Sequence, residues 1–463
     1  MNGDKKEVLQ LQTEYDEAQT ATTNSQNCES QFMQRPRRSI TARLFGIGLM
    51  SLLLLAVFTH PGFNIVRSVS DYYEFSTGLN EPGYPDPSDG AVVRCIGSTE
   101  WDEYYELPSW AQQFPFGSES LFTLPVGSDS LYLISRGAFH YGTLTVEQST
   151  EASDDVTVRI RAAYFKEEVF ERTNICYLKR QENQNGIGIY ASFFLQHYTS
   201  KSRLPGQDDK DQLMFDVTLT LPASASEDAL YIKSLETSAP LFRHEVAALS
   251  DTVFFGSISL NTLHFPINVQ SVAAETGIFT TANGLIKGHF HSTSSLKLIT
   301  TNMPIDADVV LFHNESAKPS ELVMATANAP LNARVSLTTA SGYGGEFGVD
   351  AQTANAPFTL TYVNSTVYSQ LNSKSKTANA PATVHLHSAF EGSFSISSSI
   401  IGPSLEQHRV EDPAGKGRER HITASRSWGH IQGSVRWAEA EHCRSGTGFV
   451  QLSTVLSPAR LIL

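Results

Sequence analysis

The sequence predicts an all-β ectodomain, either β-sandwich-like or a β-solenoid with repeated coils, together with one N-terminal transmembrane α-helix and a disordered tail. Three observations support this fold class. Short runs of alternating apolar and polar residues fill the chain from about residue 92. The pentapeptide TANAP occurs three times after residue 325. A long uncharged apolar run lies near the N-terminus.

Residues 1–43 are rich in Gln, Thr, Asn, Ser and charged residues and poor in large apolar ones, which predicts a disordered tail. Six basic and six acidic residues cancel within this segment, so the net charge of −14 belongs to the remaining chain. Because nucleic acids are bound by cationic surfaces, so acidic a chain argues against a nucleic-acid partner.

The run from Leu44 to Phe58 contains no charged residue, and as a helix it would span roughly 22 Å. We assign residues 44–60 to a transmembrane helix that contacts the lipid bilayer. A cleaved signal peptide fits less well, because 43 residues make too long an n-region and no A-x-A site follows. A buried helix of a soluble domain would show a polar face, which this run lacks.

The charges that flank this run predict its orientation. Four arginines lie in residues 35–43 on its N-terminal side, whereas the other side offers only His60 and Arg67. By the positive-inside rule, residues 1–43 are cytosolic and the C-terminal part is lumenal or extracellular, in the secretory pathway or at the cell surface. The two N-x-S/T sequons, at Asn314 and Asn364, both lie on that side, and we expect glycosylation there.

Beyond the membrane helix the chain is divided by composition and pattern. Gly and Pro recur through residues 71–90, so residues 61–91 are predicted to be a stalk or linker. We assign residues 92–250 to a β-rich module and residues 251–463 to a β-solenoid repeat module.

Three cysteines follow the membrane helix, namely Cys95, Cys176 and Cys443, and they allow one disulfide. We favour the pair Cys95–Cys176 because both residues lie in the first module. Spacing alone leaves the other pairings open.

The repeats give the most detailed prediction. TANAP begins at Thr326, Thr353 and Thr377, and two looser copies begin at Thr281 and Thr300, so that successive starts differ by 19, 26, 27 and 24 residues. Such periods are typical of solenoid coils. The third residue of every copy is Asn, and stacking would place these side chains in a hydrogen-bonded column: Asn283, Asn302, Asn328, Asn355 and Asn379.

We interpret each copy as a turn that feeds a β-strand. Asn tolerates left-handed backbone and Pro fixes φ where the strand begins, which would explain the turn. Counted from each start, offsets five, seven and nine are apolar or small, whereas offsets six and eight are mostly polar. This alternation, kept in register over five copies, predicts strands whose odd offsets face a shared core.

The runs TANGLIKG, TTNMPIDADVV and TANAPL, with the terminal pair GSVRWAEAE and GTGFVQLST, resemble the putative-adhesin family of β-solenoid domains. That family includes bacterial envelope proteins and uncharacterised single-pass membrane proteins of fungi. The resemblance covers roughly residues 121–463 and implies fold and membrane topology, but no activity. The insert at residues 406–421 does not map onto the family pattern, and we expect its basic part to form a solvated loop.

Two H-x-H pairs, His289/His291 and His385/His387, fall at offsets eight and ten, on the predicted outward face. Same-face histidines could bind a transition metal, but each pair lacks a third ligand and three coils separate them, so exposed polar positions are the preferred interpretation.

A charged column is the second candidate site. Offset eight places His289, Asp308 and Arg334 on consecutive coils, with Asp306 nearby, and carboxylates beside arginine could serve a polysaccharide-acting enzyme. A ladder of complementary charges explains the same pattern.

We therefore predict a non-enzymatic, membrane-anchored, adhesin-like interaction protein, with a carbohydrate or protein ligand of the ectodomain and no cofactor. The alternatives are a carbohydrate-active β-solenoid enzyme, which would use the charged column, and a structural scaffold.

Overall fold

The computed structural model describes residues 84–104, 111–137, 140–191, 210, 212–314, 318–438 and 448–463. Nearly all secondary structure in these ranges is β, which confirms the all-β prediction; the helices are η2 (Pro87–Asp89), η3 (Ser98–Glu100) and α4 (Glu167–Phe170). Within the same ranges no helix has the length and apolarity needed to cross a membrane. The predicted tail, the predicted membrane helix at 44–60 and most of the predicted linker lie outside the described residues.

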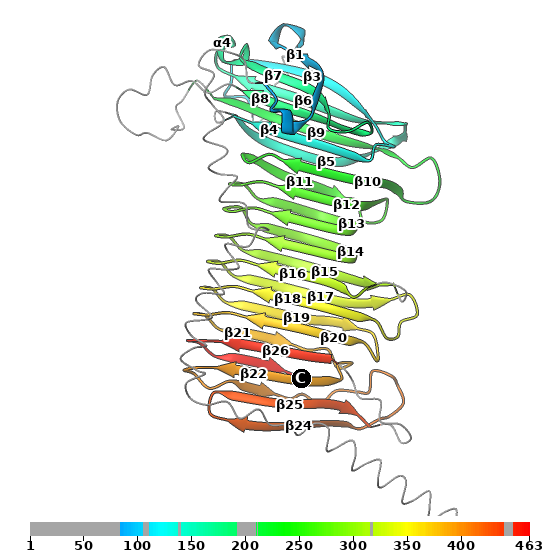
Figure 1. Cartoon of the computed structure of the whole chain (residues 1–463), viewed down its shortest axis with the longest axis vertical. Coiled ribbons are helices and arrows are strands. Elements are labelled where there is room, and N and C mark those ends of the chain that lie inside the picture. The colour runs from blue at the N-terminus through cyan, green and yellow to red at the C-terminus, as the bar shows by residue number, and fades with distance from the viewer. Residues whose placement is uncertain are drawn as a thin grey trace, which may run out of the picture. The chain divides into compact units, whose positions relative to one another are not determined.

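The strands line up in two rows, here called sheet 1 and sheet 2, which share the long strands β13 and β14 (Figure 1). The order in sheet 1 is β1 (Ala91–Ile96), β7 (Thr173–Lys179), β8 (Gln184–Ala191), β4 (Ser130–Arg136), β10 (Leu230–Ser238), β12 (Val253–Asn261), β13 (Ile267–Thr280), β14 (Ile286–Ile299), β16 (Ser320–Ala325), β18 (Glu346–Gln352), β20 (Gln370–Lys376), β26 (Gly448–Thr454), β22 (Gly392–Ser398), β25 (His430–Trp437) and β24 (Arg420–Ser427). The order in sheet 2 is β2 (Asp102–Glu103), β3 (Phe116–Pro125), β6 (Asp155–Tyr164), β9 (Leu213–Ala223), β5 (His140–Ala152), β11 (Phe242–Ala248), β13, β14, β15 (Ile305–His313), β17 (Leu331–Thr339), β19 (Phe358–Ser365), β21 (Ala382–His385), β27 (Ala459–Ile462) and β23 (Ser404–Glu406).

Pairing in the middle of both sheets is parallel, as expected when successive coils stack on one another. Antiparallel strands close the sheets at both ends of sheet 1 and at the β2–β3–β6–β9 end of sheet 2. The last coil breaks sequence order, because β26 lies between β20 and β22 and β27 lies between β21 and β23. The C-terminal strands are therefore inserted between two earlier coils.

The register predicted from the repeats is confirmed. The residues at offset five pair in succession and are all buried: Ile286, Ile305, Leu331, Phe358 and Ala382. Their neighbours at offset six point to the other face and are exposed or half-buried. Side chains of the two sheets meet between them. For example, Phe279 lies in the part of β13 that pairs with β12 of sheet 1, Phe290 lies in the part of β14 that pairs with β15 of sheet 2, and their rings are 4.9 Å apart. Burying each such large apolar side chain stabilises the fold by roughly 1.5–3 kcal/mol.

The sheets cross the predicted module boundaries without interruption. Strands β4 and β10 pair in parallel, as do β5 and β11, so the stacking begins well before residue 250. The folded part also begins before residue 92, because Asp89, within the predicted linker, is only 1% exposed.

Candidate functional site

The five repeated asparagines form a hydrogen-bonded ladder on the surface of the coil corners. Each side-chain amide donates to the side-chain oxygen of the asparagine one coil earlier, at 2.6 or 2.7 Å, from Asn379 through Asn355, Asn328 and Asn302 to Asn283. All five side chains are exposed. The structure thus brings together residues that are 19 to 27 positions apart in sequence.

Backbone bonds repeat in the same corners. In each corner the carbonyl oxygen of the second residue accepts the N–H groups of two consecutive residues of the next coil, as Thr301 does from Ala327 and Asn328. The ladder also extends one coil further than the sequence predicted, because Asn283 Nδ2 lies 3.0 Å from His264 Nδ1.

The reason proposed for Asn in the turn is wrong. Among the described non-glycine residues only Tyr368 has a positive φ, at 63°, so none of the five asparagines adopts left-handed backbone. Asn occurs in these corners because its side chain is both a donor and an acceptor, which lets it bond to the coils on either side.

The first residue of TANAP has a role that the repeat analysis missed. The threonines are buried, and the hydroxyl groups of Thr300, Thr326 and Thr353 donate to the carbonyl oxygen of the fourth residue of the preceding corner, at 3.0 to 3.3 Å. A looser pattern, T-x-x-x-P, carries part of this signal. It adds the corners at 262–266 (TLHFP) and 454–458 (TVLSP), but it also matches 218–222 (TLTLP) within β9 and misses the copy at 281–285 (TANGL).

The charged column is assembled as predicted from its register. Asp308 lies between His289 and Arg334, with Oδ2 3.4 Å from His289 Nδ1 and Oδ1 3.1 Å from Arg334 Nε. The three side chains are 66% (His289), 44% (Asp308) and 69% (Arg334) exposed. Asp306 is also exposed, two residues away on the same strand and face. At such exposure water screens the charges strongly.

The H-x-H pairs are separated as predicted, since three coils lie between His289 and His385. Burial lowers the pKa of His291, His385 and His387, and nearby Arg460 lowers that of His385 further. The offset-ten histidines, His291 and His387, are half-buried and not fully outward. Among the residues described, no group of three or more His, Cys, Asp or Glu side chains could hold a metal ion.

The two sequon asparagines are accessible. Asn314 follows β15 directly, Asn364 lies near the end of β19, and both are exposed. A sugar chain needs this accessibility at its attachment point.

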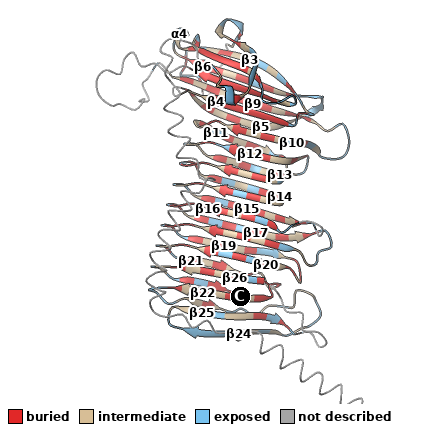
Figure 2. Ribbon diagram, viewed as in Figure 1, coloured by how far each residue is buried: buried red, intermediate tan, exposed pale blue. Residues whose placement is uncertain are grey.

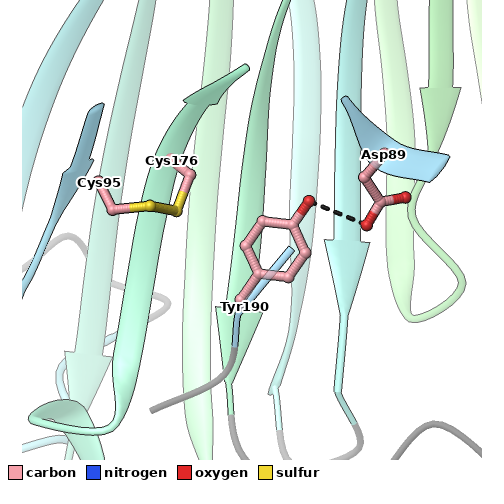
Figure 3. The surroundings of a disulfide bond; sticks show 4 residues. All are labelled: Asp89, Cys95, Cys176 and Tyr190. Carbon is pink, nitrogen blue, oxygen red and sulfur yellow. Dashed lines mark hydrogen bonds between the residues drawn. A yellow bond between two sulfur atoms is a disulfide. The ribbon is translucent and has the colours of Figure 1, made fainter. Parts of the chain in front are cut away.

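Cys95 and Cys176 form a disulfide between directly opposed positions of β1 and β7 (Figure 3). Nearby, buried Asp89 accepts a hydrogen bond from Tyr190 Oη at 3.0 Å and pairs with Arg136 at 2.9 Å. Together the disulfide and the Asp89 contacts fasten the first described segment to the outer side of sheet 1.

The insert at 406–421 is not the fully solvated loop that its charge suggested. The Arg418 side chain is 5% exposed; it pairs with Asp412 at 2.8 Å and lies over the rings of Trp437 and Tyr368. The correction has a physical reason: a guanidinium can be buried when a carboxylate and aromatic faces replace its water.

No family model matches the chain, and no curated protein matches it. Among solved structures, one match is a putative cell adhesion protein from Clostridium sporogenes, which shares 8% sequence identity. The match covers 75% of this chain and 99% of that chain, with a TM-score of 0.17. At those values the likeness bears on neither fold detail nor function.

Proposed function

We propose that this chain is a single-pass type II membrane protein whose ectodomain is a β-solenoid that acts as a non-enzymatic, adhesin-like interaction module. The bilayer contact would be made by residues 44–60, as the apolar run and its flanking charges suggest. The coil stacking and the exposed sequons are compatible with a glycosylated lumenal or extracellular domain.

One surface supports binding most directly. On the outer side of sheet 1, strands β22, β24, β25 and β26 align polar side chains, most of them uncharged, and one phenylalanine, here called the hydroxyl face: Ser393, Ser395, Ser397, Thr423, Ser425, Gln432, Ser434, Phe449, Gln451 and Ser453. His421, His430 and Arg436 lie on the same side at the margins of this face. Their inward neighbours, such as Ile396 and Leu452, are fully buried. The face is therefore backed by rigid core.

The chemistry of the hydroxyl face suits a neutral glycan. Hydroxyl and amide groups recur about every 4.8 Å across the strands, and every second residue along them faces outward. Phe449, 39% exposed, lies beside Ser393, with Ser434 one strand further on, and offers a ring on which a sugar can stack. Hydroxyl, amide and aromatic groups together match sugar hydroxyls and apolar sugar faces.

The charged column supports the enzyme alternative less well. Catalytic carboxylates act where water is excluded and electrostatic interactions are strong, whereas Asp308 is 44% exposed and already contacts His289 and Arg334. A ladder of complementary surface charges accounts for the same contacts.

A glycan array probed with the full chain in nanodiscs tests the proposal, with product analysis of every bound glycan. We expect binding without turnover, and loss of binding in Phe449→Ala with Gln451→Ala. The matched control is Asn302→Ala on the coil corner, which should bind normally. Turnover that disappears in Asp308→Asn would instead establish the enzyme, and absence of both binding and turnover would favour the scaffold.

Topology has a separate test. In a secretory host we expect a glycan on Asn314 or Asn364, removable by a glycosidase and lost when both residues are changed to Gln. An unglycosylated product whose ectodomain is digested by protease from the cytosolic side would overturn the orientation.

A further inference from the structure

Three turns meet at the end of the stack where β22, β25 and β26 finish or begin. The backbone N–H of Ser398 donates to the carbonyl of Gly429 at 3.0 Å, in the turn between β24 and β25. The hydroxyl of Ser398 donates to the carbonyl of Ser457 at 2.9 Å, in the turn after β26. The loop after β22 is thus joined to both other turns.

These turns carry four large apolar side chains that face solvent, here called the terminal patch: Trp428 (75% exposed), Ile400 (65%), Leu456 (47%) and Ile401 (45%). Adjoining strand β24 is likewise exposed along most of its length (Figure 2). Single exposed apolar residues are ordinary, but a group drawn from three bonded turns marks an interaction site.

Two details show that the patch is held in place. Gly429 has a φ of 70°, and a Cβ there would lie 2.7 Å from the Ser398 carbonyl oxygen, so the backbone beside Trp428 is closely packed. Leu456 occupies the corner position that holds Asn in five other coils, and its N–H makes the same bond, to Ala378 at 2.9 Å. At this coil the amide ladder therefore gives way to an apolar side chain.

The terminal patch adjoins a basic residue. Arg426 lies two residues before Trp428 on β24 and is exposed. The three turns, at residues 398–403, 427–430 and 454–458, contain no acidic residue, although the whole chain carries −14.

We propose that the terminal patch docks on the surface of a lipid bilayer, with Trp428, Ile400 and Ile401 in the interfacial region and Arg426 at a lipid phosphate. Tryptophan is favoured at the membrane–water interface, and basic residues add attraction to anionic headgroups. Two copies of the chain meeting through this patch would bring two Arg426 side chains together, and the three turns hold no carboxylate to pair with them. Isoleucine and leucine offer no planar face to a sugar ring.

This inference does not depend on the membrane helix, and its test separates the two. The full chain is reconstituted into vesicles of phosphatidylcholine with phosphatidylserine, and flotation reports whether it is in the bilayer. Brominated lipids, placed either in those vesicles or in a second vesicle population, quench tryptophans that enter the interface. Trp428 is one of four tryptophans, so we expect partial quenching that is absent in Trp428→Phe.

Docking should weaken at least tenfold in Ile400→Ser with Ile401→Ser, and high salt or Arg426→Glu should reduce it further. All three residues are exposed, so the thermal midpoint should stay unchanged. The matched control is Val92→Ser with Val93→Ser, an exposed apolar pair at the opposite end of sheet 1, which should leave quenching intact. No quenching from either vesicle population, with the protein floating normally, would overturn the proposal. So would a dimer that dissociates in the Ile400→Ser, Ile401→Ser variant.

Discussion

The side-chain amide of Asn328 donates to the side-chain oxygen of Asn302 at 2.7 Å, although 26 positions separate the two residues. The same bond joins Asn302 to Asn283 across only 19 positions. The corners thus keep one geometry while the coil length varies, and the extra residues are accommodated elsewhere in each coil. A ladder of this kind fixes which residues of neighbouring coils face each other.

Replacing Asn328 by Ala removes two ladder bonds, to Asn302 and to Asn355. Because the bonds are exposed, we expect the free energy of unfolding to fall by only about 1 kcal/mol. Urea unfolding of the full chain measures it. Asn379→Ala, which removes one bond of this series, should cost about half as much. Equal effects of the two variants would show that the ladder bonds do not set the stability.

Part of this architecture could be predicted from the sequence because its signals are local. Inward and outward positions follow from the alternation of side chains, so the repeat register alone predicts that Ile305 and Leu331 lie opposite each other, as they do. The asparagine column followed from the same register. The Cys95–Cys176 pair was favoured from module membership, and the structure joins these two residues.

The rest depends on partners that are distant in sequence. Arg418 lies in a run of charges that resembles a solvated loop, and only the fold brings Trp437 and Tyr368 over it. The position of β26 between β20 and β22 is likewise not predictable from side-chain alternation. Several strands of the stack could pair with β26 in parallel, and the alternation pattern is the same for each of them. The repeat pattern does not predict the buried threonine hydroxyls, because Asn and Pro are sufficient to explain a turn and leave the threonine without an assigned role.

Reduction of the Cys95–Cys176 disulfide should destabilise the fold. The two residues are 81 positions apart. A crosslink over a loop of that size lowers the conformational entropy of the unfolded chain, which raises the free energy of unfolding by about 4 kcal/mol. We expect Cys95→Ser to lower the thermal midpoint by several degrees and to make it insensitive to reductant. A midpoint equal to that of the oxidised wild type would contradict this expectation.

Stability should depend on pH through two buried histidines. Burial lowers the pKa of His140 and His244 to about 4, whereas the unfolded chain takes up these protons near pH 6.5. Between pH 6.5 and 4 the unfolded state binds protons that the native state excludes. The contribution of the two neutral histidines to the free energy of unfolding should therefore be fully present above pH 6.5. Below pH 6.5 it should fall by roughly 1.4 kcal/mol per pH unit for each histidine.

Urea unfolding between pH 5 and 7 measures this slope before most carboxylates titrate. His244→Gln should reduce the slope contributed by the two residues by half, and the double variant with His140→Gln should remove that contribution and leave the one from His291, His385 and His387, whose pKa burial also lowers. The glutamine can still bond to Thr237, which lies 2.8 Å from His244 Nε2. An unchanged slope in the double variant would assign the acid sensitivity to other groups.

The Asp412 carboxylate organises the charged insert. It accepts the backbone N–H groups of Ala414, Lys416 and Arg418 at 2.9 to 3.1 Å, and the Arg418 guanidinium at 2.8 Å. These donors hold the pKa of Asp412 well below its usual range. The stabilisation it provides is therefore present at neutral pH and is lost only in strong acid, as the carboxyl becomes protonated.

Asp412→Asn should release this segment, because it leaves the buried Arg418 cation without its principal carboxylate at a cost of up to about 3 kcal/mol. We expect rapid trypsin cleavage at Lys416, Arg418 and Arg420, which the wild type resists while Arg418 is buried. Glu411→Gln is the matched control, since it removes one negative charge from the exposed neighbouring position. If both variants are cleaved at the same rate, net charge and not the Asp412 contacts protects the segment.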